Sequence, residues 1–416
     1  MKVCVPPRSG HHEVVRDRLR VLTLRNLRAD ALVLPRAVLA EPHLGYVMDA
    51  VTDAIPLYDL AYPRDNNPTW HQATGGLRRR LRICAELART FEQIHSGGLC
   101  YVDLSMQNVL IPSDPKLTSI KLIDPDNLIV PGTALATVLG TPLFIAPELL
   151  KESRCPDHAC DRWSLAVAIF SLLVMIHPFF GDEVENGEPE LEEIALRGEL
   201  PFIDSKTDDS NRSNLRGLPR SCVLTRRLKE LCGDAFERGV SDRTARPHPE
   251  NWLSALEEAA DQTALCSHCG ATSYLPGMRV AQFVCDWCGE SNPRPIELGF
   301  FNPDPSIDNL DANEHKELRR HKTPHRLVLS ASQRTVPARL VSGTLTATGD
   351  AGLFGFKRNS SGDKVYVLKN LSADTWHTKD ISDRASTCAP GEFVYLFDQT
   401  LIVFPSGVRV KVRNLL

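Results

Sequence analysis

The sequence lacks any apolar run long enough to cross a bilayer. The longest mostly apolar stretch covers residues 165–176, whereas a membrane-spanning helix needs about 20 such residues. The opening residues, 1–7, do not begin an apolar segment of the kind that a secretory signal carries. We therefore expect a soluble, cytoplasmic protein with no membrane partner.

A large excess of one charge is also missing. The 416 residues include 48 Lys and Arg against 52 Asp and Glu, which gives a formal net charge of −4. Binding to nucleic-acid phosphates usually requires an excess of basic side chains, so we expect no nucleic-acid partner. The length predicts two or three domains, and a hydrophobic content of 42% is enough to build a sizeable core.

The twelve cysteines fall into two groups. Eight are scattered, and without a secretory signal we expect them to be buried thiols rather than disulfides. The other four form two Cys-x-x-Cys pairs that are separated by fifteen residues, a spacing typical of a structural Zn²⁺ site with four thiolates. No thioredoxin-like pattern surrounds either pair, and a segment this short needs the metal to fold. The predicted zinc ligands are Cys266, Cys269, Cys285 and Cys288.

Hydrophobic periodicity divides the chain into a mixed region and a β-rich tail. Apolar residues at three- and four-residue steps predict a long amphipathic helix over residues 77–95. Short strands are predicted at 109–111 and 121–123, a Gly/Pro/Thr-rich loop at 131–147, and helices dominate from that loop to residue 259. Beyond residue 326 short alternating strands follow, one of them at 338–347.

Five short motifs follow one another through the first 260 residues. Each is weak alone, but their order and spacing resemble the protein kinase family. The resemblance covers about residues 1–260 and is to bacterial eukaryotic-type Ser/Thr kinases with an Asp-x-Asp metal motif. The motifs are Asp103 with Asn108, Ile123-Asp124-Pro125-Asp126, Ala146-Pro147-Glu148, Asp161-Arg162-Trp163-Ser164-Leu165, and Arg246-Pro247 with Trp252 and Leu256.

This resemblance implies ATP-dependent phosphoryl transfer to hydroxyl groups of a protein substrate. Asp103 would orient or accept the proton of the attacking hydroxyl, and Asn108 and Asp124 would bind Mg²⁺ through oxygen atoms. Arg246 would form a buried ion pair with Glu148. Asp126 is either a second acidic group near the metal or a turn residue.

The resemblance also implies which residues hold the nucleotide. Lys2, in an apolar-Lys-apolar pattern, would be the phosphate-binding lysine, with Glu13 or Asp17 as its carboxylate partner. Residues 45–51 resemble the strand that leads to the hinge. The expected contacts to ATP there are Met48 and the main chain of Asp49 and Val51.

Several positions depart from the family pattern. No glycine-rich phosphate loop precedes Lys2, so the small lobe is predicted to be truncated: either the true protein is longer or the ATP site is incomplete. Tyr101-Val102 replaces His-Arg before the catalytic Asp, Ser105 replaces a lysine, and Pro125 replaces a phenylalanine. The alternative to an active kinase is therefore a pseudokinase scaffold that binds partners.

The tail, residues 326–416, weakly resembles a forkhead-associated β-sandwich. The resemblance rests on residues 367–372 with Trp376, and on Pro390-Gly391-Glu392. The family's phosphothreonine-binding residues are not evident, so the other interpretation is a structural or docking domain. In related kinases such tails and zinc ribbons recur beside von Willebrand A-type and phosphatase partners.

The predicted fold class is a multidomain α+β protein. It combines a protein kinase-like fold with a truncated small lobe, a Cys4 zinc ribbon and a C-terminal all-β, sandwich-like domain. The predicted boundaries are 1–260 for the kinase-like domain (small lobe 1–52, large lobe 53–260), 262–295 for the zinc ribbon, 296–325 for a linker and 326–416 for the β domain.

Overall fold

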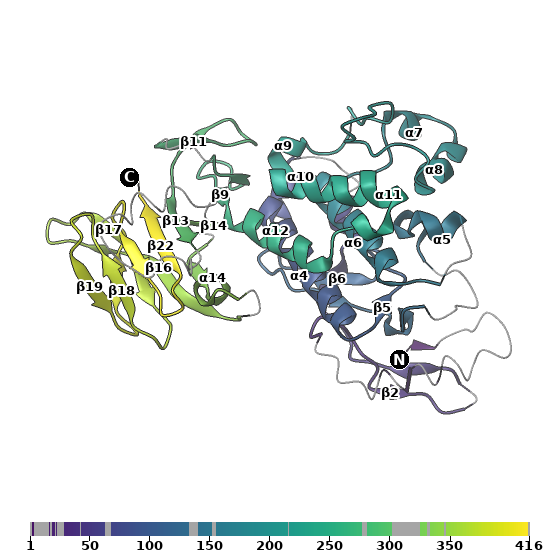
Figure 1. Cartoon of the computed structure of the whole chain (residues 1–416), viewed down its shortest axis with the longest axis horizontal. Coiled ribbons are helices and arrows are strands. Elements are labelled where there is room, and N and C mark those ends of the chain that lie inside the picture. The colour runs from purple at the N-terminus through teal and green to yellow at the C-terminus, as the bar shows by residue number, and fades with distance from the viewer. Residues whose placement is uncertain are drawn as a thin grey trace. The chain divides into compact units, whose positions relative to one another are not determined.

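The structure is a computed structural model in which the chain divides into two compact units, residues Met1–Glu257 and Glu258–Leu416 (Figure 1). Each unit is described by itself. The described residues are 2–3, 16, 19–20, 22, 29–41, 43–62, 68–132, 140–151, 155–214, 216–276, 281–301, 325–330, 333–344 and 347–414. Among them, no helix combines the length and the apolar composition that crossing a membrane requires.

The first unit opens with a small antiparallel sheet. Its strands lie in the order β1 (Lys2–Val3), β3 (Gly45–Val47), β2 (Ala37–Val38). Lys2 pairs with Tyr46 in this sheet. A parallel bridge between Leu32 and Leu122 connects the segment before β2 to the rest of the unit.

Two helices form the core of the first unit. The predicted amphipathic helix is confirmed as α4 (Gly76–Ser96), and the apolar residues that define its periodicity are buried. α4 packs against α6 (His158–Val174), which is buried on nearly all sides. Asp157 caps α6 by accepting hydrogen bonds from the amides of Ala159 and Cys160, at 2.9 and 3.3 Å.

Short strands beside these helices carry the predicted site. β5 (Cys100–Tyr101) pairs with β8 (Leu128–Ile129), and β6 (Val109–Pro112) lies between β4 (Ala54–Pro56) and β7 (Lys121–Leu122). The remaining elements of this unit are mostly short. They are α2 (Tyr58–Ala61), α3 (Pro68–Ala73), η1 (Pro125–Asn127), η2 (Pro142–Phe144), α5 (Pro147–Lys151), α7 (Asp182–Asn186), α8 (Pro189–Leu196), α9 (Arg220–Val223), α10 (Arg226–Gly233), η3 (Asp234–Arg238), α11 (Gly239–Ser241), η4 (Arg243–Ala245) and α12 (Pro249–Asp261), whose last residues belong to the second unit. Several of them, such as α2 and α3, pack against α6 or α4.

The second unit begins with two cysteine-bearing hairpins. β9 (Thr263–Leu265) pairs with β10 (Thr272–Tyr274), and β11 (Gln282–Val284) pairs with β12 (Ser291–Pro293). A small apolar cluster that includes Phe283 and Val328 joins them to the sheet that follows.

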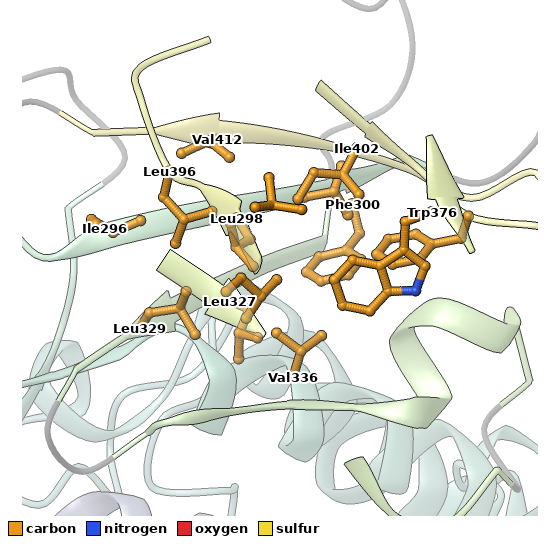
Figure 2. Packing of buried hydrophobic residues seen from close by; sticks show 14 of the residues in the cluster. Ile296, Leu298, Phe300, Leu327, Leu329, Val336, Trp376, Leu396, Ile402 and Val412 are labelled. Atoms are coloured by element: carbon orange, nitrogen blue, oxygen red, sulfur yellow. The ribbon is translucent and has the colours of Figure 1, made fainter. Parts of the chain in front are cut away.

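That sheet and a second one form a β-sandwich around a single core. Buried side chains from both sheets, such as Leu298, Leu368 and Ile402, belong to one hydrophobic cluster, with Trp376 among its largest members (Figure 2). The six-stranded sheet has the order β14-β13-β22-β21-β18-β19, and the four-stranded sheet has the order β15-β16-β17-β20. The strands are β13 (Ile296–Phe301), β14 (His325–Leu329), β15 (Thr335–Pro337), β16 (Asp350–Arg358), β17 (Lys364–Asn370), β18 (Trp376–Lys379), β19 (Ala385–Cys388), β20 (Phe393–Tyr395), β21 (Leu401–Val403) and β22 (Arg409–Arg413).

Two sequence-based expectations differ from this structure. The predicted linker 296–325 begins with β13, an inner strand of the six-stranded sheet whose alternate residues Ile296, Leu298 and Phe300 enter the core (Figure 2). The predicted strand at 338–347 begins instead as helix α14 (Ala338–Ser342). Gly343, at φ +74°, ends this helix in the left-handed conformation that glycine adopts at low cost.

Candidate active site and cysteine cluster

The loop between β5 and β6 brings Asp103 and Asn108 together. The Asn108 side-chain amide donates to the main-chain oxygen of Asp103 at 3.1 Å, and its main-chain amide donates to Ser105 at the same distance. The loop is thus closed on itself by its own hydrogen bonds. The Asn108 side chain is thereby fixed against the main chain of Asp103.

Asp124 follows β7 and lies beside this loop. The amide of Ile123 donates to the oxygen of Asn108 at 2.9 Å, and the Tyr101 hydroxyl donates to the oxygen of Ile123 at 2.6 Å. Asp124 itself adopts φ 61° and ψ 56°, a left-handed conformation that costs a non-glycine residue about 1–2 kcal/mol. Such a cost is tolerated where surrounding bonds fix the backbone, often at functional sites.

The electrostatics of Asp103 show that other carboxylates are close. Burial raises the pKa of Asp103, and the negative charges of Asp124 and Asp126 raise it further. Hydrogen bonds from Thr141 oppose the increase: its amide and hydroxyl both donate to Asp103 Oδ1, at 2.8 and 3.1 Å. Three carboxylates in one neighbourhood favour a cation between them, because like charges that share a site repel unless they are neutralised.

Tyr46 contacts Asp126, and this contact was not predicted from the sequence. Its fully buried side chain extends from β3, and its hydroxyl donates to Asp126 Oδ1 at 2.9 Å. The small sheet is therefore hydrogen-bonded to the predicted metal-binding segment. Asp126 lies in the short helix η1, so it is both a turn residue and an acidic neighbour of Asp103.

The structure describes part of the predicted nucleotide-binding set. Lys2 lies in β1, next to the strand that carries Tyr46, but its side chain lies outside the described part, as do Glu13 and Asp17. Met48 follows β3 and is partly buried.

Asp49 and Val51 line a cavity of about 640 Å³ in which Asp49 forms an exposed ion pair with Arg36, at 2.6 Å. The residues that line this cavity do not include Asp103, Asn108 or Asp124. Among the described residues, the structure thus brings Asp103, Asn108 and the segment of Asp124 close to one another, and Asp49 and Val51 line a cavity of their own.

Buried polar contacts hold the catalytic segment on the helical core. Asp161 of α6, which is 1% exposed, accepts hydrogen bonds from the Tyr101 amide at 2.7 Å and from His95 Nε2 at 2.9 Å. The predicted ion pair is also present, since Arg246 contacts both oxygens of Glu148 at 2.8 and 2.7 Å. Burial raises the pKa of Glu148, but the hydrogen bonds and charge of Arg246 outweigh this effect and lower the pKa below its ordinary value.

The four cysteines of the two Cys-x-x-Cys pairs converge in the second unit. Their sulfur atoms all lie within 4.8 Å of one another, and the distances Cys266–Cys288 and Cys269–Cys285 are both 3.7 Å. Four thiolates at about 2.3 Å from a tetrahedral Zn²⁺ would lie about 3.8 Å apart, so the arrangement fits this metal.

Hydrogen-bond donors surround the sulfur atoms. The amides of His268 and Trp287 each donate to a sulfur at 3.4 Å, and the side chain of Asn292 donates to Cys266 at 3.3 Å. Gly270 and Gly289 follow the two pairs, each at φ +74°. These donors stabilise thiolates, which is the form that binds a metal. His268 contributes its main chain to the cluster.

Comparison with known proteins bears on the first unit. Residues 73–251 match the protein kinase domain family. The matched range includes the motifs from Asp103 to Arg246, and it supports the protein kinase-like fold expected for this region. The zinc ribbon and the forkhead-associated-like domain remain predictions beside the observed cysteine cluster and β-sandwich.

Proteins whose sequences are similar to part of this chain include several protein kinases. Calcium-dependent protein kinase 6 of Oryza sativa subsp. japonica is 30% identical over 164 residues, 37% of this chain and 29% of that protein. Serine/threonine-protein kinase SBK2 of Rattus norvegicus is 37% identical over 128 residues, 26% of this chain and 35% of that protein. Protein kinase YegI of Escherichia coli O157:H7 is 27% identical over 267 residues, 60% of this chain and 38% of that protein. The chain thus spans between about a quarter and two fifths of the length of these relatives.

Proposed function

We propose that this chain is an ATP-dependent Ser/Thr protein kinase that transfers the γ-phosphate to protein hydroxyl groups. The observation that carries the proposal is the hydrogen bonding of Asn108: its side chain donates to the main-chain oxygen of Asp103, and its main-chain oxygen accepts from the amide of Ile123, the residue before Asp124. Phosphoryl transfer depends on positioning and charge neutralisation, which such a cluster can supply.

Each residue of the cluster has a distinct task. Asp103 orients the substrate hydroxyl, and its raised pKa makes the carboxylate a better proton acceptor. The side-chain oxygens of Asn108 and Asp124 are hard donors of the kind that Mg²⁺ prefers, and these two residues would hold it. Bound Mg²⁺ neutralises the charge of the nucleotide phosphates. Tyr46 fixes Asp126 beside them.

The cysteine cluster and the location complete the proposal. We propose that Cys266, Cys269, Cys285 and Cys288 hold a structural Zn²⁺, since four protein ligands leave no position for a substrate. The similarity to a bacterial kinase over 60% of the chain supports a role in bacterial signalling, and we propose a cytoplasmic location. A von Willebrand A-type protein or a phosphatase is the signalling partner that the resemblance suggests.

Phosphate transfer from radiolabelled ATP to a generic protein substrate tests the kinase proposal. We expect Mg²⁺-dependent incorporation that falls by about 10²–10⁴-fold in Asp103→Ala, the range for a lost general base, and that is also lost in Asp124→Ala. Asp209→Ala, at an exposed aspartate far along the same unit, is the matched control and should keep full activity. Absence of incorporation from the unaltered chain would favour the pseudokinase scaffold, and incorporation that survives both substitutions would refute the roles given to Asp103 and Asp124.

A further inference from the structure

A cavity of about 620 Å³ in the second unit has no role in the chemistry described above. It lies between the cysteine hairpins, which contribute Ser267 and Asn292, and one end of the β-sandwich, which contributes Phe354, Phe356 and Tyr366. Its volume falls within the range of about 300–1,000 Å³ that is typical of ligand pockets.

The sandwich end of this cavity is aromatic. Phe354 packs against the sandwich core, and Phe356, two residues further along β16 and therefore on the same face, is 56% exposed. The rings of Phe354 and Tyr366 stack at 5.5 Å with an interplanar angle of 12°. The inner face of the β16–β17 hairpin thus continues past the core and offers uncovered aromatic surface to the cavity.

The charged side chains that line the cavity are all basic. Lys364 Nζ lies 4.6 Å from the centre of the Phe356 ring and 4.9 Å from that of Tyr366, distances that allow cation–π attraction. Arg334 also lines the cavity, and so does Arg294, which is neutralised by Glu297 at 2.7 Å. Lys364 and Arg334 are both exposed, so they can meet a ligand from solution.

The net charge of residues 326–416 also favours an acidic ligand. Residues 326–416 carry twelve Lys and Arg against seven Asp and Glu, a surplus of five positive charges, although the complete chain has a net charge of −4. The segment that carries the aromatic wall is therefore net basic. An occupant that complements this wall must be acidic and must also present apolar surface.

We propose that this cavity binds an acidic peptide segment of a partner protein. An apolar side chain of the peptide would rest on Phe354, Phe356 and Tyr366, and flanking carboxylates would meet Lys364 and Arg334. The aliphatic and proline residues of the floor favour a peptide side chain over a row of stacked bases, which single-stranded nucleic acid would need.

The cysteine cluster fixes the opposite wall. Asn292 lines the cavity, donates to Cys266 and accepts hydrogen bonds from the amide and hydroxyl of Ser267, both at 2.8 Å. The position of this wall is therefore tied to the sulfur cluster rather than to a free loop. Peptide binding should accordingly depend on the integrity of the hairpins.

Fluorescence anisotropy with two degenerate peptide pools tests the proposal. In one pool Asp and Glu flank a central apolar residue, and in the other Asn and Gln replace the acids. We expect the full chain to bind the acidic pool, and Lys364→Glu or Arg334→Glu to weaken binding at least tenfold. Lys357→Glu is the matched control, because Lys357 is on the same strand but lies 3.6 Å over Phe393 on the other face. It should change binding less than twofold.

Three results would overturn the proposal: equal binding of both pools, equal weakening by Lys357→Glu and Lys364→Glu, or displacement of the acidic pool by lower concentrations of an oligouridine than of unlabelled acidic peptide. Circular dichroism of each variant verifies folding, which substitution of exposed lysines should leave intact. Because no nucleotide is added, failure here would leave the kinase proposal unaffected.

Discussion

The buried Glu148–Arg246 pair gives the sharpest prediction about stability. Arg246 has a fully buried side chain, and Glu148 is the carboxylate that it contacts among the described residues. Glu148 has a second partner, because Arg243 Nε donates to it at 2.8 Å. Removal of one member of a buried pair costs about 3–5 kcal/mol when the other is left uncompensated.

Substitution of Glu148 should therefore lower the free energy of unfolding by a different amount from substitution of Arg246. Glu148→Leu leaves Arg246 without this carboxylate. We therefore expect the free energy of unfolding to fall by about 4–5 kcal/mol, near the upper end of that range. Arg246→Leu leaves Glu148 with Arg243, so we expect a smaller loss, about 2–3 kcal/mol, from the remaining burial and the orphaned main-chain oxygens of Gly239 and Ala159. In a unit of this size, 1 kcal/mol lowers the melting temperature by about 2–4 °C.

Thermal and urea unfolding of the two variants and of the double variant measure this asymmetry. The double substitution should cost less than Glu148→Leu alone, because no unpaired charge remains. Equal losses in the two single variants, or a larger loss for Arg246→Leu, would refute the reasoning about the second partner.

The stability that the Glu148–Arg246 pair contributes should also depend on pH. The pKa of Glu148 is lower in the folded chain than its ordinary value of about 4.3. Its stabilising contribution is therefore complete above the unfolded pKa and is lost as the pH falls through the folded pKa. The stability difference between the unaltered chain and Glu148→Gln should shrink between about pH 5 and pH 3, and a difference that stays constant would contradict this.

Three further predictions concern other contacts. The purified chain should contain one Zn²⁺ per molecule, measured by elemental analysis, and Cys288→Ser should lose it; an unchanged metal content would exclude the cluster as the site. Tyr46→Phe removes the hydrogen bond to Asp126 and should lower kcat several-fold without changing the melting temperature by more than a few degrees, whereas unchanged kcat would show that the bond has no role. Asp261 is fully buried and contacts His325 at 2.8 Å and Arg339 at 2.9 Å, so Asp261→Leu should destabilise the second unit by about 3–5 kcal/mol in urea unfolding.

Local patterns in the sequence predicted much of the fold. The periodicity of residues 77–95 gave α4 within one residue at each end, because one face of a long helix must be apolar to pack. The catalytic-loop residues Asp103 and Asn108 lie close in the sequence, so their proximity in the structure follows from a short loop.

Contacts between segments that lie far apart in the sequence could not be predicted in the same way. Tyr46 and Asp126 are 80 residues apart, and nothing in either local sequence indicates the partner. β13 was included in the predicted linker with the charged residues that follow it, and its neighbours in the sheet, β14 and β22, both come later in the chain. The segment at 338–342 has an alternating pattern, but Pro337 before it and Gly343 after it favour a single helical turn.

The two hydrogen bonds from Thr141 both end on Oδ1 of Asp103, and no described residue is hydrogen-bonded to Oδ2. The carboxylate is therefore asymmetric: Oδ1 is engaged by Thr141, and Oδ2 accepts no hydrogen bond from a described residue. In the proposed phosphoryl transfer an entering hydroxyl would bond to Oδ2, so the segment that carries Thr141 would select the side from which a substrate hydroxyl approaches. Sequence changes near residue 141 would then alter which substrates react, even though they leave every metal ligand in place.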